Sequence, residues 1–188
     1  MSRRRLSFLF LVLTALSVFL TNAENDAEKN AERRGRINAT AGETLETLFE
    51  KSPKAKVLYD KAYGYAVFDN LKLSLFISGG GGAGVAVEKT SGQRTYMKMG
   101  TIGLNIGLGG QKYQVVFLFQ DKQTFDSFLN KGWKAEAQAN AVAGPAGANA
   151  AATFTNGMAV YQLTEAGLML QADIAGTKYW KSDKLNKP

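Results

Sequence analysis

The stretch "LFISGGGGAGVAVEK", residues 75–89, decides how the middle of this chain folds. Gly79, Gly81 and Gly84 satisfy the spacing G-x-G-x-x-G, which dinucleotide-binding proteins use to hold a phosphate group. That use requires a helix directly after the glycines, because the helix N-terminus holds the pyrophosphate. Residues 85–88, "VAVE", instead alternate and include β-branched side chains, which favours a strand.

Two further features argue against a phosphate site at these glycines. No Asp or Glu occurs from Lys89 to Gln120, where a dinucleotide-binding domain has an acid for the ribose, and no stretch reads G-K-[ST] as a P-loop does. We therefore predict that the glycines let a strand bend or let another backbone approach closely.

Strand patterns surround this stretch from residue 65 onward. They are short apolar or alternating runs: "YAVFD", "LSLFIS", "AGVAVEK", "RTYMKMGTIGLNIGL", "YQVVFLF", "KAEAQANAVA", "AATFT", "MAVYQLT" and "LMLQADIAG". One helix, "DKQTFDSFLNKG", interrupts them, with Asp121 as its cap, Gly132 as its stop, and an apolar face of Phe125, Phe128 and Leu129.

Helical patterns precede the strands. "GETLETLFEKS" has Leu45, Leu48 and Phe49 at helical spacing. In "SPKAKVLYDKAYG" we expect Ser52 to cap a helix, Pro53 to occupy its first turn, and Gly64 to end it in a left-handed conformation; its apolar face holds Ala55, Leu58, Tyr59 and Ala62. The fold class predicted is α+β, with N-terminal helices, one inserted helix, and a mainly antiparallel, strongly curved, glycine-rich and barrel-like sheet.

The first residues read as an export signal. Arg3 to Arg5 form a basic region, Leu6 to Leu20 an apolar one, and cleavage after Ala23 would make Glu24 the first residue. The apolar run is shorter than the about 20 residues that cross a bilayer, so a retained anchor is the less favoured alternative. We expect three parts: a signal peptide (1–23), a polar tail or weak helix (24–41) and one domain (42–188). The protein is then exported, to the periplasm or cell envelope, or secreted.

Composition limits the chemistry of this chain. It has no histidine and no cysteine, which removes the Ser-His-Asp triad, the Cys-His pair and the usual zinc and copper sites. No stretch has the alternating acids of a calcium loop. We expect no metal, no cofactor and no enzymatic activity, although a carboxylate pair or a Lys or Tyr base stays an open alternative.

Charge gives a weak indication of partners. The net charge of +7 includes the three arginines of the signal, and their removal leaves 20 basic against 16 acidic residues. This mild excess does not favour nucleic acid as a partner.

An ordered set of motifs resembles a known family. "KAYGYAVFDNLKLSLFISGGGGAGVAV", the glycine-spaced strand after it, "VVFLFQDKQTFDSFLNKGWKAEAQANAVAGPAG" and "GLMLQADIAG" together resemble the SYLF, or Ysc84-related, domain over about residues 45–176. The resemblance implies a lipid-binding module. Eukaryotic members act at membranes through phosphoinositides, and exported bacterial members are single domains like this one.

The resemblance also implies where lipid would bind. In eukaryotic members lipid binding is linked to a basic, amphipathic N-terminal segment, which here supplies Arg33, Arg34, Arg36, Lys51, Lys54 and Lys56. Glutamates in the same segment dilute this charge, which disfavours recognition of a highly phosphorylated head group. Near a predicted turn, Lys72 and Leu71 are further candidates for contact with, and insertion into, a membrane.

Two functional hypotheses follow. In the first, the protein attaches to anionic phospholipid or holds a lipid-like ligand. In the alternative, it is a structural or protein-interaction module of the cell envelope with no lipid ligand. An ordinary solvated face explains the basic residues equally well, and core packing explains Leu71 better than insertion does. Trp133, Tyr179 and Trp180 suit interfacial anchors, but aromatics that close a sheet are commoner.

Overall fold

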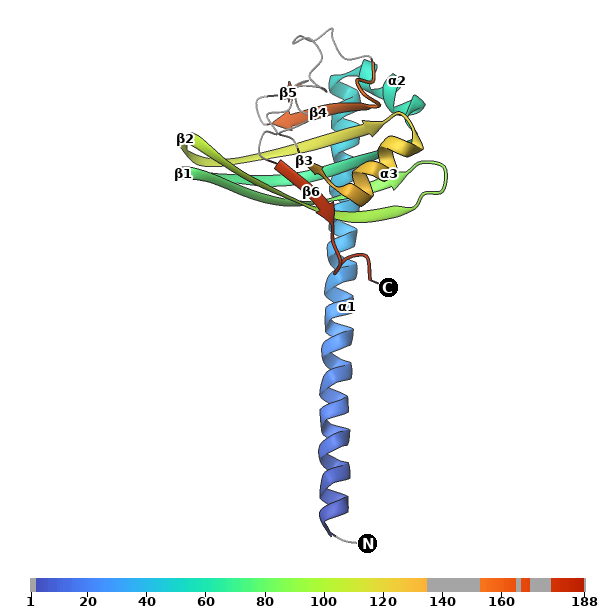
Figure 1. The fold of residues 1–188 in the computed structure, drawn as a ribbon, viewed down its shortest axis with the longest axis vertical. Coiled ribbons are helices and arrows are strands. Elements are labelled where there is room, and N and C mark those ends of the chain that lie inside the picture. Colours follow the sequence, from blue (N-terminus) through green and yellow to red (C-terminus); the bar gives the residue numbers. More distant parts are fainter. Residues whose placement is uncertain (1–2, 135–152, 165–166, 170–176, 188) are drawn as a thin grey trace. The chain divides into compact units, whose positions relative to one another are not determined.

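The structure is a computed structural model that describes residues 3–134, 153–164, 167–169 and 177–187. It divides into two compact units, Met1–Arg36 and Ile37–Pro188. The second unit holds the sheet and the remaining helices (Figure 1). The predicted α+β class with antiparallel strand pairing is confirmed.

The first helix, α1, spans Arg3–Lys51. It therefore covers the predicted signal peptide, the residues predicted as a polar tail or weak helix, and the helical pattern that ends at Lys51. From Ile37 onward α1 belongs to the second unit, where Leu45 and Leu48 are buried as their spacing predicted. Cleavage after Ala23 stays a prediction.

The second helix, α2 (Pro53–Lys61), begins as predicted and ends earlier than predicted. The Ser52 side chain accepts a hydrogen bond from the backbone N–H of Ala55, and Pro53 occupies the first turn. The helix ends at Ala62, whose backbone is extended and whose N–H bonds to the carbonyl of Tyr59. Gly64 was predicted as a left-handed stop, which is wrong because it is the first residue of the next strand.

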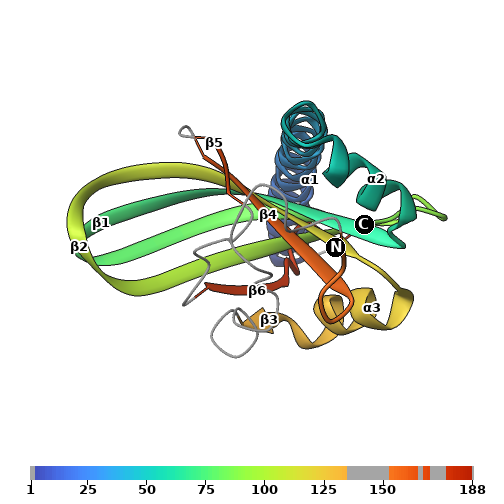
Figure 2. The same cartoon turned by 90° about the horizontal axis from the view of Figure 1, so that it is seen from above.

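Two long strands, β1 (Gly64–Glu88) and β2 (Arg94–Phe119), form one antiparallel hairpin. The sequence predicted five separate short strands here. The hairpin keeps one register from Gly64 to Leu75, shifts between Leu75 and Ile77, and then continues to Val87. In Figure 2 the two strands curve round together, so that the second half of the hairpin lies against the first.

The glycines of the opening stretch let the two halves of this hairpin meet. A β-carbon at Gly82 would lie 2.1 Å from the carbonyl oxygen of Asp69, and one at Gly84 would lie 2.2 Å from that of Val67. No side chain fits at these distances. β1 continues through Gly84 to Glu88 with no helix after the glycines. The predicted close approach of two backbones is confirmed, and the phosphate loop is excluded.

Shorter strands extend the sheet from the edge of β2 that does not pair with β1: β6 pairs with Met97–Thr101 and β4 with Tyr113–Phe119. The described strands are ordered β3-β6-β2-β4-β5, with β1 paired to β2. They are β3 (Trp133–Lys134), β4 (Met158–Thr164), β5 (Gly167–Met169) and β6 (Thr177–Lys181). This described path does not close into a barrel. The strand predicted at "KAEAQANAVA" and most of the one at "LMLQADIAG" lie outside the described residues.

The inserted helix, α3 (Lys122–Lys131), follows its prediction closely. The Asp121 carboxylate accepts a hydrogen bond from the N–H of Thr124 at 2.8 Å, and Gly132 ends the helix at a φ of +66°. Phe125 and Phe128 are buried on its inner face.

Each face of the sheet has its own hydrophobic core. Under α3 lies an aromatic cluster that includes Phe68, Phe117, Phe119 and Tyr179 with Phe128. On the opposite face, the end of α1 and α2 cover a mainly aliphatic cluster: Ala41, Leu45, Leu48, Ala55, Leu58, Val67, Val85, Val116, Leu118, Tyr161 and Leu163. Alternate residues of each strand serve the two cores, as the period of a strand requires.

Candidate functional site

The structure does not bring all the predicted basic residues into one site. Arg33, Arg34 and Arg36 lie in the unit Met1–Arg36, whereas the three lysines lie in the unit Ile37–Pro188. Arg36 forms an exposed ion pair with Glu32 at 2.5 Å, one turn away on the same helix. An exposed pair of this kind contributes little to stability and offsets the charge offered to a partner.

The lysines of α2 and its flanks form the better-defined part of the predicted surface. Lys51, Lys54, Lys56 and Lys61 are exposed, and between them Val57 is 55% exposed. Lys56 contacts Asp60 at 2.6 Å and lies over the Phe49 ring at 5.8 Å. We call Lys51, Lys54, Lys56, Val57 and Lys61 the α2 face.

Leu71 and Lys72 lie on β1, opposite Lys112 and Gln111 of β2. This places their backbones next to the bend of the hairpin. Their side chains lie outside the part that the structure describes, so insertion of Leu71 and contact by Lys72 stay predictions.

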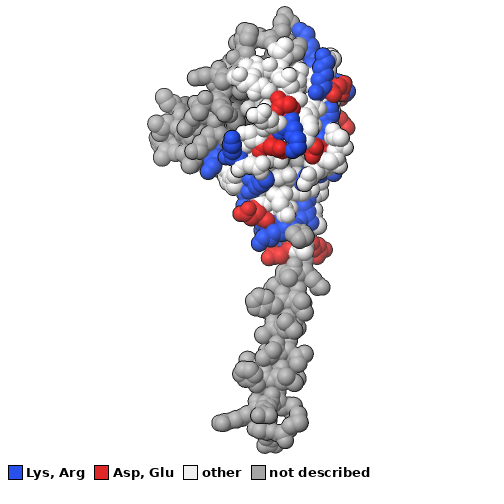
Figure 3. Space-filling model, turned by 45° about the vertical axis from the view of Figure 1, so that its right-hand side comes forward, with Lys and Arg blue, Asp and Glu red and all other residues white. Residues whose placement is uncertain are grey.

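Acidic side chains accompany the basic ones over much of the visible surface. Figure 3 shows Lys and Arg interspersed with Asp and Glu on the face it presents, without a broad area of one sign. Local arrangements of charge with exposed apolar groups therefore matter more for binding than the net charge.

Lys89 has a structural position that the sequence did not reveal. Its Nζ donates to the carbonyl oxygens of Tyr59 and Asp60, at 2.7 and 3.1 Å, and lies 4.6 Å from the centre of the Tyr59 ring. These carbonyls belong to the last turn of α2, where a cation is favourable. Partial burial lowers the pKa of Lys89. This lysine secures α2 to the hairpin.

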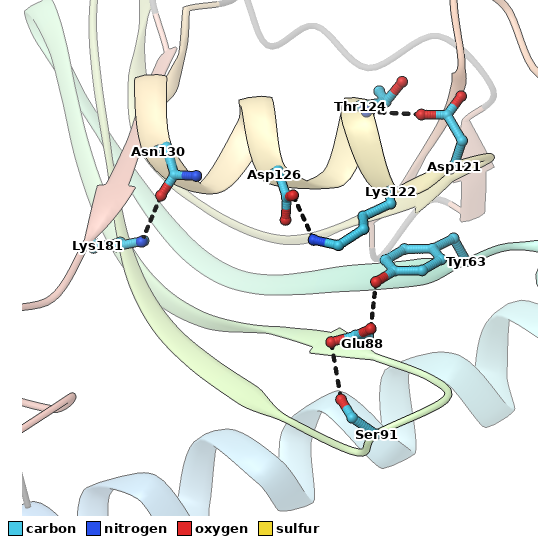
Figure 4. A network of polar contacts seen from close by, with 9 residues as sticks. All are labelled: Tyr63, Glu88, Ser91, Asp121, Lys122, Thr124, Asp126, Asn130 and Lys181. Atoms are coloured by element: carbon cyan, nitrogen blue, oxygen red, sulfur yellow. Dashed lines mark hydrogen bonds and ion pairs between the residues drawn. The ribbon is translucent and has the colours of Figure 1, made fainter.

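Polar side chains at the end of the hairpin lie beside polar side chains on the surface of α3 (Figure 4). The Tyr63 hydroxyl and the Ser91 hydroxyl both donate to the Glu88 carboxylate. These bonds lower the pKa of Glu88, and the bond to Glu88 raises the pKa of Tyr63. Beside them, Lys122 pairs with Asp126 at 2.6 Å. A general acid needs a raised carboxylate pKa, and the shift at Glu88 has the opposite sign.

Two buried amides lie on the sheet face under α3. Asn70 is 2% exposed, and neither its Nδ2 nor its Oδ1 has a hydrogen-bond partner among the described residues; the same is true of the buried Oε1 of Gln162. Asn70 is in register with Tyr113, and Gln162 with Val115 two residues along the same strand, so these side chains flank β2. Buried amide atoms without a partner cost free energy, so a polar group that paired with them would stabilise the domain.

The described residues offer neither a metal site nor a membrane-spanning helix. They contain no group of three or more acids that could hold a metal ion. They also contain no helix with the length and apolar content needed to cross a bilayer.

Sequence reasoning missed β6 and the face that it exposes. The alternation in "TKYWK", residues 177–181, with its β-branched and aromatic side chains, was the available signal for this strand. Tyr179 points into the core, whereas Trp180 is 38% exposed. Trp180 is in register with Lys98 on β2.

Comparison with known proteins identifies the family. Residues 100–188 match a family model described as "Ysc84: Las17-binding protein actin regulator". A protein of Aeromonas veronii named "Beta cell expansion factor A" is 50% identical over 149 residues, which cover 79% of this chain and 57% of that protein. Residues 100–188 of this chain belong to the Ysc84-related (SYLF) family. The resemblance inferred from the ordered motifs is confirmed.

The match locates the candidate surfaces relative to the Ysc84-related region. It begins at Gly100 and includes α3, β4 and β6, whereas α2 precedes it. The chain spans 57% of the length of the Aeromonas relative. The family description names a binding and regulatory role, which agrees with the expectation of a binding module at that coarse level.

Proposed function

We propose that this Ysc84-related protein is an exported module that attaches to anionic membrane lipids, with the α2 face as one contact. The observation that carries the proposal is the combination of exposed lysines with Val57 on a short, well-capped helix. A lysine close to an anionic membrane contributes about 1 kcal/mol, and the contribution decays within a Debye length of about 8 to 10 Å. Four such lysines, partly offset by Asp60, support weak and salt-sensitive attachment.

Vesicle sedimentation tests this proposal. The purified protein is mixed with vesicles of phosphatidylcholine, or of equal parts phosphatidylcholine and phosphatidylglycerol, while NaCl is raised from about 0.05 to 0.5 M. We expect binding only to the anionic vesicles, with steep weakening as salt rises. Binding to both kinds of vesicle equally, or to neither, contradicts the proposal.

A pair of variants examines the contribution of the α2 face. Lys54→Gln with Lys61→Gln removes two charges on this surface, and we expect binding to weaken more than tenfold. Lys122→Gln with Lys131→Gln removes two charges from α3 as a matched control. Equal weakening by both pairs would show that total charge, and not the α2 face, governs binding.

A lipid-like ligand held inside the domain is a second form of the same function. It is supported by the Asn70 amide and the Gln162 Oε1, which are buried beside an apolar core without a hydrogen-bond partner among the described residues. Mass spectrometry of the protein under native conditions would show an added mass that organic extraction removes. A protein of the bare chain mass with full activity toward vesicles would contradict this form.

The alternative is a protein-interaction module without a lipid ligand. The family description supports it, because it names Las17 and actin as the objects of binding and regulation. Vesicle experiments separate the two functions, since a protein-interaction module binds no vesicle selectively. Export to the periplasm, cell envelope or medium is proposed from the leader, and an N-terminus at Glu24 in the purified protein would support it.

A further inference from the structure

Near β6, the sheet face that the end of α1 covers at Tyr96 continues with an unusual set of residues. Gly81, Lys178 and Trp180 are exposed there, and Ala83, Lys98 and Gly100 are partly exposed. On this face β1 contributes Gly81 and Ala83, β2 contributes Lys98 and Gly100, and β6 contributes Lys178 and Trp180. We call these six residues the β6 platform. Their alternate neighbours, Gly82, Met97, Met99 and Tyr179, point the other way, toward the interior.

The register places the bulky and small members in a definite order. Trp180 is opposite Lys98, which is opposite Ala83; one step along, Lys178 is opposite Gly100, which is opposite Gly81. Residues directly opposite each other in an antiparallel pair have β-carbons about 4.5–5.5 Å apart. Trp180 therefore lies next to Lys98 and Lys178, and the neighbouring positions on this face hold the small residues Gly100, Ala83 and Gly81.

The glycine at position 81 is not required by packing. A β-carbon there would approach only the carbonyl oxygen of Met99, at 3.7 Å, an ordinary contact. At Gly82, one residue on, a β-carbon would meet the Asp69 carbonyl oxygen at 2.1 Å. Gly81, Ala83 and Gly100 thus add little side-chain volume beside Trp180, so a partner can approach the backbone of the sheet closely there.

The charge of the platform is uncompensated. Neither Lys98 nor Lys178 makes an ion pair with any described residue, in contrast to Lys56 and Lys122. The six platform residues include no acid. An indole ring has an apolar body and a polar N–H, and tryptophan is enriched where a membrane meets water.

From this arrangement we propose that the β6 platform is a docking surface for an anionic phospholipid bilayer, with Trp180 inserted at the interface and Lys98 and Lys178 facing the head groups. The inference rests on the proposed function and adds to it a second contact that the basic segment did not predict. A negatively charged bilayer surface matches two lysines that make no ion pair with a described residue and lie beside one amphipathic ring.

Tryptophan fluorescence tests the platform directly, because the chain has only two tryptophans, Trp133 and Trp180. The full-length variant Trp133→Phe reports on Trp180 alone. With vesicles of equal parts phosphatidylcholine and phosphatidylglycerol, we expect its emission to shift to the blue and to be quenched by brominated acyl chains. With vesicles of phosphatidylcholine alone, we expect neither change.

The same samples separate failure of the platform from failure of the proposed function. Protein that sediments with anionic vesicles while Trp180 emission is unchanged overturns the platform and leaves membrane attachment standing. Protein that does not sediment at all contradicts both. A change of Trp180 emission with single-stranded DNA but not with vesicles would assign the surface to nucleic acid and overturn the proposal.

Charge variants provide an independent check. In the Trp133→Phe background, Lys98→Gln and Lys178→Gln should each weaken vesicle binding about fivefold. Lys131→Gln, on α3 across the sheet, is the matched control and should change binding less than about twofold. Circular dichroism confirms that each variant is folded. If the control weakens binding as much as the platform variants do, general charge accounts for the attraction and the platform does not.

Discussion

The two faces of the second half of the hairpin use alternate residues of the same strands for different purposes. The inner face holds Gly82, Gly84, Met97, Met99 and, from β6, Tyr179, all packed against the first half of the hairpin or the aromatic core. On the outer face, Val85 and Tyr96 pack in the core under α1 and α2, and the residues farther along form the β6 platform, where Lys178 and Trp180 are exposed. Glycines a few residues apart in the sequence therefore have different roles: packing requires those of the inner face, and it does not require Gly81.

The largest expected effect comes from the inner glycines. Gly84→Ala places a β-carbon 2.2 Å from the Val67 carbonyl oxygen, so the backbone of one layer must move. We expect a loss of more than about 4 kcal/mol in the free energy of unfolding, or failure to fold. Gly81→Ala, on the outer face, should change it by less than about 0.5 kcal/mol.

Denaturant titration followed by circular dichroism measures both glycine variants. If Gly84→Ala is as stable as Gly81→Ala, the two faces do not differ in how tightly they pack. If only Gly81→Ala keeps a cooperative transition at an unchanged midpoint, the difference between the faces is supported.

The next effect separates two adjacent aromatics. The Tyr179 ring is fully buried, with centroids 4.7 Å from Phe68 and 5.0 Å from Phe117, so Tyr179→Ala should cost about 3–5 kcal/mol. Trp180→Ala should cost less than about 1 kcal/mol while it weakens binding to anionic vesicles. Thermal unfolding and vesicle sedimentation measure the two properties. If Trp180→Ala unfolds the protein as Tyr179→Ala does, Trp180 is a packing residue.

The local signals in the sequence predicted local structure well. Ser52 and Asp121 cap their helices as expected, since a cap depends on residues within one turn. The spacing of Leu45 and Leu48, and of Phe125 and Phe128, predicted which helix faces are buried. Gly84 was assigned to strand on its neighbours alone, and the structure agrees.

What the sequence did not predict depends on contacts between distant residues. Five short strand patterns became one folded hairpin because pairing with β2 continues through the glycines, and no local signal states that register. Gly64 resembled a helix stop, but its site beside the Val87 carbonyl oxygen and the Phe125 ring requires a residue without a side chain. The β6 platform combines residues from three strands, so neither Lys98 nor Trp180 could be assigned to it before the register was known.

The smallest expected effect concerns Tyr63 and Glu88, at the edge of the inner face. Their side chains are hydrogen-bonded to each other, whereas the lysines of the β6 platform make no ion pair with a described residue. The hydrogen bond from Tyr63 lowers the pKa of Glu88 below its ordinary value of 4.5, so the folded state favours the charged carboxylate. Its contribution to stability is present above pH 4.5 and is lost as the pH falls through the lower, folded value. The same bond raises the pKa of Tyr63 above 10.0, so that contribution is lost as the pH rises through the higher value.

Tyr63→Phe removes the hydroxyl and should flatten both ends of this pH profile. We expect the wild-type melting temperature to fall more steeply than that of Tyr63→Phe below about pH 4.5 and again above about pH 10. Ser91→Ala removes only the second donor to Glu88, so it should reduce the acid slope and leave the alkaline slope unchanged. Identical profiles for wild type and Tyr63→Phe would mean that Tyr63 and Glu88 are as independent of one another as the lysines of the β6 platform.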